Sequence, residues 1–367
     1  MPSMVAGSSP TVLVTGSAGL VGSASVETFA KKGLRVVGVD NDQRRAFFGP
    51  GATTHGTRLS LEERFPSYLH VDADIRDAAA MDRVFADHGS DIGLVIHAAA
   101  QPSHDWAADA PVVDFEVNAL ATLQLLERVR ARCPRAVFIY ASTNKVYGDT
   151  PNSLPLVEHE TRWEVDPSHA YAAQGVPETM SVDATMHSLI GCSKLAADVM
   201  VQEYGRYFGI RTACFRCGCI TGGRHAGAPQ HGFLAYLMRC AVRKEPYAIH
   251  GYKGKQVRDN IHADDLVAAF EHFFHDPEEG AVFNMGGGRH SNCSLLEAVA
   301  LCERASGNKL NVTYGPEARK GDHIWWISDV GKFARAYPGW SYRHDLASIV
   351  ADVYEGARLA AGASGAP

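Results

Sequence analysis

Short apolar runs alternate with amphipathic stretches through the first 220 residues, and this alternation predicts strands separated by helices. The run Thr11–Thr15 is apolar and β-branched, as is typical of a strand buried on both faces. It stops at a glycine-rich turn, after which a helix is predicted from Leu20 to Lys32. A second buried strand, at 34–39, ends at Asp40. This order of elements predicts a βαβ unit with a glycine turn at its first corner.

The same alternation continues toward residue 220. Strands are predicted at 68–75, 94–97, 136–140 and 211–216, and helices at 78–88, 112–130 and 188–207. The predicted fold class is therefore α/β, a doubly wound parallel Rossmann sheet with a smaller C-terminal substrate-binding α/β domain. We place the Rossmann domain at 10–220 and the substrate-binding region at 221–355, where regular alternation is lost and short segments can return to the first domain. The Pro-, Glu- and Ser-rich stretch 150–183 is expected to be a surface segment beside the site.

The glycine turn has the spacing of a dinucleotide-binding loop. Gly16 permits a tight turn, Gly19 allows close approach of a pyrophosphate, and Gly22 allows the helix to pack near the strand. Asp40 suits the ribose hydroxyls and would repel the extra phosphate of NADP, so NAD is the expected cofactor; Arg44 and Arg45 are a weak argument for NADP. Further cofactor contacts are expected from Leu20, Val21, Asn41, Asp74, Ile75, Ala98, Ala99, Ala100 and Asn118.

Composition narrows the functional class. The chain has 367 residues, 46% of them hydrophobic, and a formal net charge of −6 without a basic block, so nucleic acid is not an expected partner. The start of the chain lacks an apolar signal core, and no stretch approaches the roughly 20 apolar residues of a membrane span. A cytoplasmic location is expected. Among the eight cysteines, Cys214, Cys217 and Cys219 are the only close cluster, and without a second ligand pair no metal site is predicted.

Several motifs together resemble a known enzyme family. They are the glycine turn, Asp40, Ser-Thr-Asn-Lys-Val-Tyr-Gly at 142–148, Gly-Cys-Ser-Lys at 191–194, and Val-Arg-Asp at 257–259. This set is similar to the extended short-chain dehydrogenases/reductases of the nucleotide-sugar epimerase/dehydratase family. Within it, the runs at 142–149 and 254–259 most resemble the CDP-tyvelose (CDP-paratose) 2-epimerases. The similarity extends over residues 10 to 355.

The resemblance implies an NAD-dependent isomerase that removes hydride from a sugar carbon and returns it through a transient ketone. By position in the motifs, Thr143 would bind the reacting oxygen, Lys194 the nicotinamide ribose, and Arg258 the diphosphate. The implied substrate is a nucleotide-diphosphate sugar, linked to CDP, UDP, GDP or dTDP. The resemblance also implies a homodimer that pairs through helices 112–130 and 190–207. Further substrate contacts are expected from Gln101, Asn144, Arg224 and Asp322.

The tyrosine of the family's Tyr-x-x-x-Lys pattern is missing, because its position holds Ile190. Loss of a general base costs on the order of 100- to 10,000-fold in rate. One hypothesis is that another group replaces the phenol; Tyr147 and His187 are the favoured candidates. The others by residue type are Cys192, Cys217 and His104.

Two further hypotheses explain Ile190. The substrate arrives already oxidised, as for a dehydratase or oxidoreductase that deprotonates no alcohol, or the chain binds NAD and a sugar nucleotide without catalysis. The retained Lys194 and Thr143 favour catalysis. The segments 217–221 and 323–326 depart from the 2-epimerase pattern on the substrate side. Sugar, nucleotide, reacting carbon and direction of reaction therefore stay open.

Overall fold

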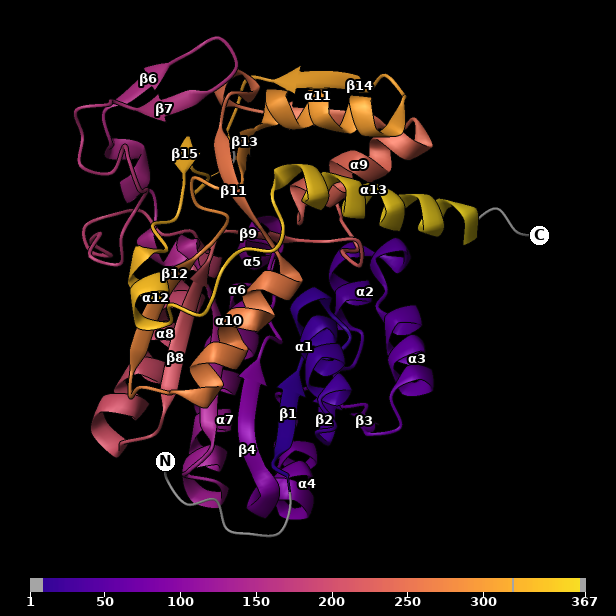
Figure 1. Ribbon diagram of the computed structural model, residues 1–367, viewed down its shortest axis with the longest axis vertical. Coiled ribbons are helices and arrows are strands. Elements are labelled where there is room, and N and C mark those ends of the chain that lie inside the picture. Colours follow the sequence, from indigo (N-terminus) through magenta and orange to yellow (C-terminus); the bar gives the residue numbers. More distant parts are fainter. Residues whose placement is uncertain (1–8, 319, 364–367) are drawn as a thin grey trace.

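A seven-stranded parallel sheet forms the centre of the molecule (Figure 1). The computed structural model describes residues 9–318 and 320–363. The strands of the sheet lie in the order β12-β8-β5-β4-β1-β2-β3, and every neighbouring pair is parallel. Their bounds are Thr11–Thr15 (β1), Val36–Val39 (β2), Tyr68–Val71 (β3), Ile92–His97 (β4), Val137–Thr143 (β5), Thr212–Cys217 (β8) and Ala281–Met285 (β12). The order reverses between β1 and β4, which is where ligands bind in this architecture, and the predicted doubly wound fold is confirmed.

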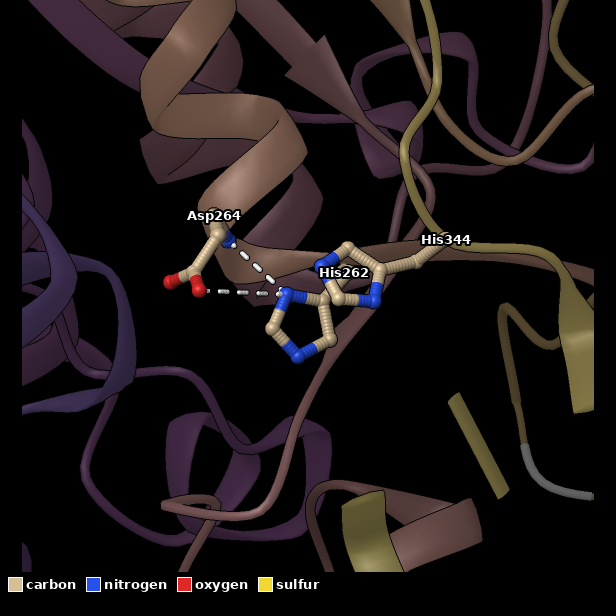
Figure 2. Close-up of side chains that lie close together, drawn as sticks. All are labelled: His262, Asp264 and His344. Atoms are coloured by element: carbon tan, nitrogen blue, oxygen red, sulfur yellow. Dashed lines mark hydrogen bonds and ion pairs between the residues drawn. The ribbon is translucent and has the colours of Figure 1, made fainter. Parts of the chain in front are cut away.

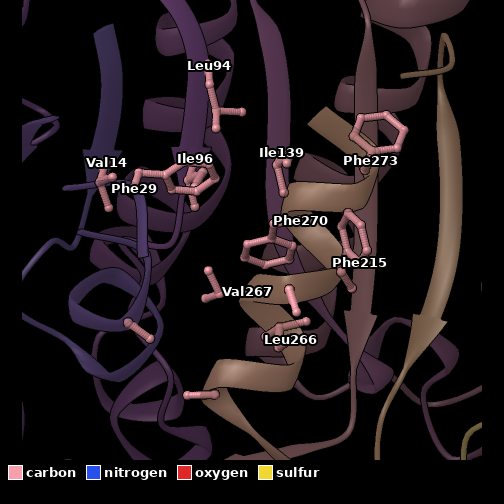
Figure 3. Packing of buried hydrophobic residues seen from close by; sticks show 14 of the residues in the cluster. Val14, Phe29, Leu94, Ile96, Ile139, Phe215, Leu266, Val267, Phe270 and Phe273 are labelled. Carbon is pink, nitrogen blue, oxygen red and sulfur yellow. The ribbon is translucent and has the colours of Figure 1, made fainter. Parts of the chain in front are cut away.

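Helices cover both faces of this sheet, because side chains of each strand alternate between the faces. Val12 and Val14 of β1 pack with one hydrophobic cluster, and Leu13 packs with another. The first cluster includes α1 (Leu20–Lys31), α3 (His55–Arg64) and α10 (Ala263–His275); Figure 3 shows the aromatic and aliphatic side chains of α10 against the strands. The second includes α4 (Ala78–His88), α7 (Ala121–Arg132) and α8 (Leu189–Phe208).

The helix predicted over 112–130 is interrupted. It consists of α6 (Pro111–Phe115), a π-helical turn over Glu116–Leu120, and α7. The turn contains Asn118, whose side chain bonds both backbone groups of Gln101. A widened turn of this kind often occurs at functional sites, and here it holds the segment that follows β4.

The C-terminal part contains a second, smaller sheet. β11 (Val257–His262) lies between β13 (Asn292–Ser294) and β15 (Trp325–Trp326), and its end pairs with β9 (Cys219–Thr221). A parallel pair, β10 (Pro246–His250) and β14 (Asn311–Gly315), completes this part. The helices α9 (Phe233–Arg243), α11 (Leu295–Ser306) and α13 (Leu346–Ala363) lie beside it (Figure 1). Their apolar side chains pack together in one cluster.

The remaining elements are short. The segment 150–183 forms an antiparallel hairpin of β6 (Leu156–Glu158) and β7 (Trp163–Val165). α2 (Gln43–Phe48) and α5 (His104–Asp109) follow β2 and β4, and α12 (Gly331–Ala336) packs near β12. Both α10 and β12 lie beyond residue 220 in sequence yet belong to the first sheet and its cover. None of the helices in the described ranges is long and apolar enough to cross a membrane.

Candidate active site

A deep crevice of about 550 Å³ opens at the carboxyl ends of the central strands, between the two sheets. Its walls bring together the loops after β1, β2, β3, β4, β5 and β8 with β11 and the segment 224–236. All but one of the predicted cofactor contacts line it: Gly16, Gly19, Leu20, Val21, Gly22, Asp40, Asn41, Asp74, Ile75, Ala98, Ala99, Ala100 and Lys194. The exception is Asn118, which is buried behind the wall and bonded to Gln101, Asp114 and Ser193.

The glycine loop is shaped to receive a phosphate group. Gly16 has a φ of +70°, and a Cβ on Gly22 would lie 1.9 Å from the carbonyl oxygen of Gly16, so neither position accommodates a side chain in this conformation. α1 begins at Leu20, and its N-cap residue Gly19 makes no side-chain hydrogen bond to the helix, so the amides of its first turn stay available to an anion. The loop and helix therefore fit a dinucleotide pyrophosphate.

Asp40 lies at the end of β2 against this loop. Its Oδ2 accepts a hydrogen bond from the amide of Ala18 at 3.0 Å, and its Oδ1 accepts one from the amide of Asp42 at 2.8 Å. Burial raises the pKa of Asp40, while these amides oppose the rise. The carboxylate is thus held at the crevice edge, where it can accept ribose hydroxyls.

Arg44 is already engaged by the protein. Its Nη2 donates to the carbonyl of Ala226, its Nη1 lies 3.4 Å from Nδ1 of His231, and its guanidinium stacks over Phe48 at 4.9 Å. Burial lowers the pKa of Arg44 to about 10. These contacts tie the segment after β2 to the segment 224–236 across the crevice, so Arg44 is not free to bind an NADP phosphate.

The middle of the crevice is formed by β5, β8 and α8. Thr143 ends β5 and pairs in register with Cys217 of β8, and both residues line the crevice. Lys194 comes from α8, whose start is capped by Ser188. Its Nζ donates to the carbonyl oxygen of Ala141 at 2.9 Å. The hydroxyl, the thiol and the amine therefore face the same space.

The substrate side carries an unbalanced positive charge. Nη2 of Arg258 lies 2.6 Å from Oδ1 of Asp322, and Nζ of Lys145 lies 3.4 Å from the same oxygen. Burial alone would raise the pKa of Asp322, but the charges of Arg258 and Lys145 hold it well below its ordinary value. Two cations against one carboxylate favour an anionic ligand.

The other predicted substrate contacts are arranged differently. Asn144 and Gln101 both line the crevice, but the side-chain amide of Gln101 already donates to the carbonyl of Ser103 and to Oδ1 of Asp114. Arg224 sits at the rim, paired with Glu27 at 2.7 Å and Asp264 at 3.0 Å.

Comparisons with known proteins agree with this geometry. The sequence family described as GDP-mannose 4,6 dehydratase matches residues 13–350. This chain belongs to that family. The CDP-paratose 2-epimerase of Salmonella typhi is 32% identical over 94% of this chain and 98% of the relative. The resemblance inferred from the motifs is confirmed.

Solved structures of the family share the fold. The UDP-glucose 4-epimerase of Thermotoga maritima, crystallised with UDP-glucose, is 25% identical with a TM-score of 0.74, covering 95% of this chain and 99% of that one. The Thermus thermophilus UDP-glucose 4-epimerase in complex with NAD is 24% identical with a TM-score of 0.76 and the same coverage. The dTDP-glucose 4,6-dehydratase 1 of Escherichia coli is 27% identical over 94% of this chain and 91% of the relative. The relatives of this chain therefore include both epimerases and dehydratases.

The structure argues against both favoured substitutes for the family tyrosine. Tyr147 is fully buried outside the crevice; its hydroxyl donates to Oδ1 of Asn284 at 2.8 Å and accepts from Nη1 of Arg216 at 3.0 Å. Burial raises the pKa of Tyr147 to about 12. His187 also lies off the crevice wall, with Nε2 bonded to the carbonyl of Val182 at 2.8 Å. Residue type alone makes both of them candidates, and packing in this fold places them away from the crevice.

The remaining candidates to replace the tyrosine differ in whether they line the crevice. Cys192 is exposed and lies off the crevice wall, whereas His104 and Cys217 line it. Ile190 lines the crevice one turn before Lys194 and is 5% exposed, so an aliphatic side chain occupies the place of the phenol.

Sequence reasoning missed three crevice residues that the structure brings forward. One is Lys145, which its place in the 142–149 run could have indicated. The others are Gln256, directly before β11, and Asn260 within it; each lies two residues from Arg258 and also lines the crevice. Their amide nitrogens donate to the carbonyls of His250 and Arg258, respectively, while Oε1 and Oδ1 have no hydrogen-bond partner among the described residues. These buried acceptors favour a ligand with donor groups.

A cluster of His262, Asp264 and His344 lies near the start of α10 (Figure 2). Nδ1 of His262 accepts the amide of Asp264 at 3.1 Å and so caps α10, while Nε2 lies 2.9 Å from Oδ2 of Asp352. The ring of His344 stacks on that of His262 with centroids 3.9 Å apart. Because both nitrogens of His262 are engaged, this cluster acts as a helix cap and a tie to α13.

Proposed function

We propose that this protein is an NAD-dependent nucleotide-sugar epimerase that acts through a transient keto-sugar. One observation carries the proposal: a single crevice presents the glycine loop and Asp40, then Thr143 and Lys194, then Arg258. This is the order in which a dinucleotide, a reacting carbon and a nucleoside diphosphate would lie. The names of the family relatives support the same class of reaction.

The residues divide the work by position. The amides after Gly19 would hold the cofactor pyrophosphate, and Asp40 the adenosine ribose. NAD, when bound, would accept the hydride. Thr143 would hold the reacting oxygen, and the cations Arg258 and Lys145 would bind the diphosphate in charge-assisted hydrogen bonds.

The crevice favours epimerisation over dehydration. Elimination of water needs groups that take a carbon-bound proton and protonate a departing hydroxyl. Within the described ranges, the carboxylates lining the crevice are Asp40, Asp74 and Asp322. The first two lie at the cofactor end, and Asp322 is held by Arg258 and Lys145. The two residues directly after Thr143 are Asn144 and Lys145, so neither of them supplies a carboxylic acid.

A homodimer is part of the proposal. α6 and the following turn expose Val112, Phe115 and Leu120, and the adjoining α8 exposes Leu189 and Val199. Exposed apolar side chains on two neighbouring helices would be covered by the same helices of a second copy. All eight cysteines lie in the described ranges and are free, which supports a reducing compartment such as the cytoplasm.

The test is turnover of CDP-, UDP-, GDP- and dTDP-linked hexoses in deuterated water. An epimer formed without deuterium on carbon supports oxidation and return of the same hydride. An epimer that carries deuterium would indicate proton exchange beside an existing carbonyl. If the wild-type protein binds the sugars but only Ile190→Tyr turns them over, the proposal fails and the natural protein is a binding relative.

A further inference from the structure

We propose that Lys194 is itself the group that takes the proton from the reacting hydroxyl and returns it, replacing the phenol lost at Ile190. The inference rests on the proposed function. It gives Lys194 alone the work that the Tyr-x-x-x-Lys motif divides between a tyrosine and a lysine.

Lys194 is placed to reach a substrate hydroxyl held by Thr143. Its Nζ is 2.9 Å from the carbonyl oxygen of Ala141, two residues before Thr143 on β5. Ala141 and Thr143 lie about 6.6 Å apart along the strand, and Lys194 and Thr143 both line the crevice, so a substrate hydroxyl in this part of it has both side chains as neighbours. Within the described part of the chain this is the one hydrogen bond of Nζ, which leaves it able to bind such a ligand.

The surroundings of Lys194 favour its neutral amine. Burial lowers the pKa of Lys194 to about 8, and the apolar Ile190 lies one turn before it where the family has an acid. The nearest carboxylates are committed elsewhere. Asp198 is paired with Arg216 at 2.7 Å, and Asp114 accepts hydrogen bonds from the side chains of Gln101 and Asn118.

The other titratable groups around the amine carry no opposing charge at neutral pH. They are Cys214 and Cys217 of β8, Tyr140 of β5 and His97 of β4. Burial raises the pKa of both thiols and of the phenol, and it lowers the pKa of His97 to about 3. At pH 7.5 about a quarter of a lysine with a pKa near 8 is neutral, which is within the range used by catalytic bases.

Three other crevice groups are less suited. Burial lowers the pKa of Lys145, but the Asp322 carboxylate, 3.4 Å from its Nζ, opposes that shift and occupies the amine as an ion-pair partner. The Cys217 thiol has its pKa raised to about 12 by burial and contacts the carbonyl of Phe215. His104 interacts electrostatically with Asp322 and His231. It therefore lies toward the substrate-side segments.

The proton balance closes over one cycle. The proton of the reacting hydroxyl passes to the lone pair of neutral Lys194 Nζ. In the same step the C–O single bond becomes a carbonyl, and the carbon gives up its hydride, which NAD would accept. After the ketone has presented its other face, hydride returns to carbon and the ammonium returns the proton to oxygen. No net oxidant or acid is consumed.

The experiment is chemical rescue combined with a pH profile. Wild-type turnover at saturating substrate should rise about tenfold per pH unit up to pH 8 and then level off. Lys194→Ala should lose at least 100-fold in kcat, and added methylamine or ethylamine should restore part of it, more so at higher pH. Lys194→Arg, which keeps the charge but cannot act as a base at this pH, should stay inactive and unrescued.

Calorimetric titration with NAD separates this role from cofactor positioning. Lys194→Ala should retain measurable NAD binding, and amine should raise kcat without changing the affinity for NAD. A flat wild-type profile between pH 6 and 9, or no rescue of a variant that still binds NAD, overturns the inference while wild-type turnover upholds the proposed function. Absence of wild-type turnover on every sugar overturns both.

Discussion

Gly22→Ala should weaken NAD binding while leaving the fold intact. The new Cβ would lie 1.9 Å from the carbonyl oxygen of Gly16 and 2.7 Å from its carbonyl carbon, far inside contact distance. To remove this clash, α1 and the glycine loop have to separate by roughly 1 Å, at the place where the pyrophosphate would bind. Overpacking of this kind costs about 1–3 kcal/mol, or about 5- to 150-fold in affinity. Better helix propensity of alanine offsets about 1 kcal/mol of the loss in stability.

The assay is isothermal titration with NAD, together with thermal unfolding of the protein without ligand. Gly56→Ala is the matched control, because Gly56 lies in the first turn of α3 and a Cβ there meets no atom within 4 Å. It should keep the wild-type affinity and gain stability of up to about 1 kcal/mol. Equal NAD affinity of Gly22→Ala and wild type would show that the dinucleotide does not use this loop.

Three other substitutions test the core and the surface. Asp198→Asn should cost about 3–5 kcal/mol in urea unfolding, because it leaves the buried guanidinium of Arg216 without its charge partner; a loss below 1 kcal/mol would contradict this. His97 is neutral when folded but titrates near pH 6.5 when unfolded, so it makes stability fall as the pH drops below 6.5, by about 1.4 kcal/mol per unit. His97→Gln should remove that part of the slope between pH 6 and 4, and an unchanged slope would refute the assignment. Val199→Glu should yield a monomer in light scattering, whereas Leu359→Glu, at a more exposed position (59% against 43%) outside the helix pair, should not; a wild-type monomer would refute the dimer.

The first βαβ unit could be read from the sequence because its signals are local. The apolar run of β1, the glycine spacing and the acid at the end of β2 each depend on neighbours a few residues away. Strand ends also bring residues to one edge of a parallel sheet, so the crevice walls at Ala98 and Thr143 were predictable without knowing any contact.

The errors have one physical origin, which is that side-chain direction depends on partners distant in sequence. Tyr147 follows Thr143 by four residues, yet it turns inward to Asn284, 137 residues away. Asn118 has the residue type of a ligand contact, but a widened helical turn uses it to hold Gln101. Lys145 stands in the 142–149 run, but the run does not show that Asp322, 177 residues away, lies beside it.

The return of α10 and β12 to the first sheet means that the chain has no cut point between two self-sufficient halves. A fragment ending at residue 220 would leave β8 as an open edge and strip Phe270 and Phe283 from the ring of Phe215. Such an edge is a template for aggregation. Recombination or evolutionary exchange of the substrate-side segments therefore has to keep both 263–285 and α12, whose Phe333 also packs against Phe215, with the first sheet.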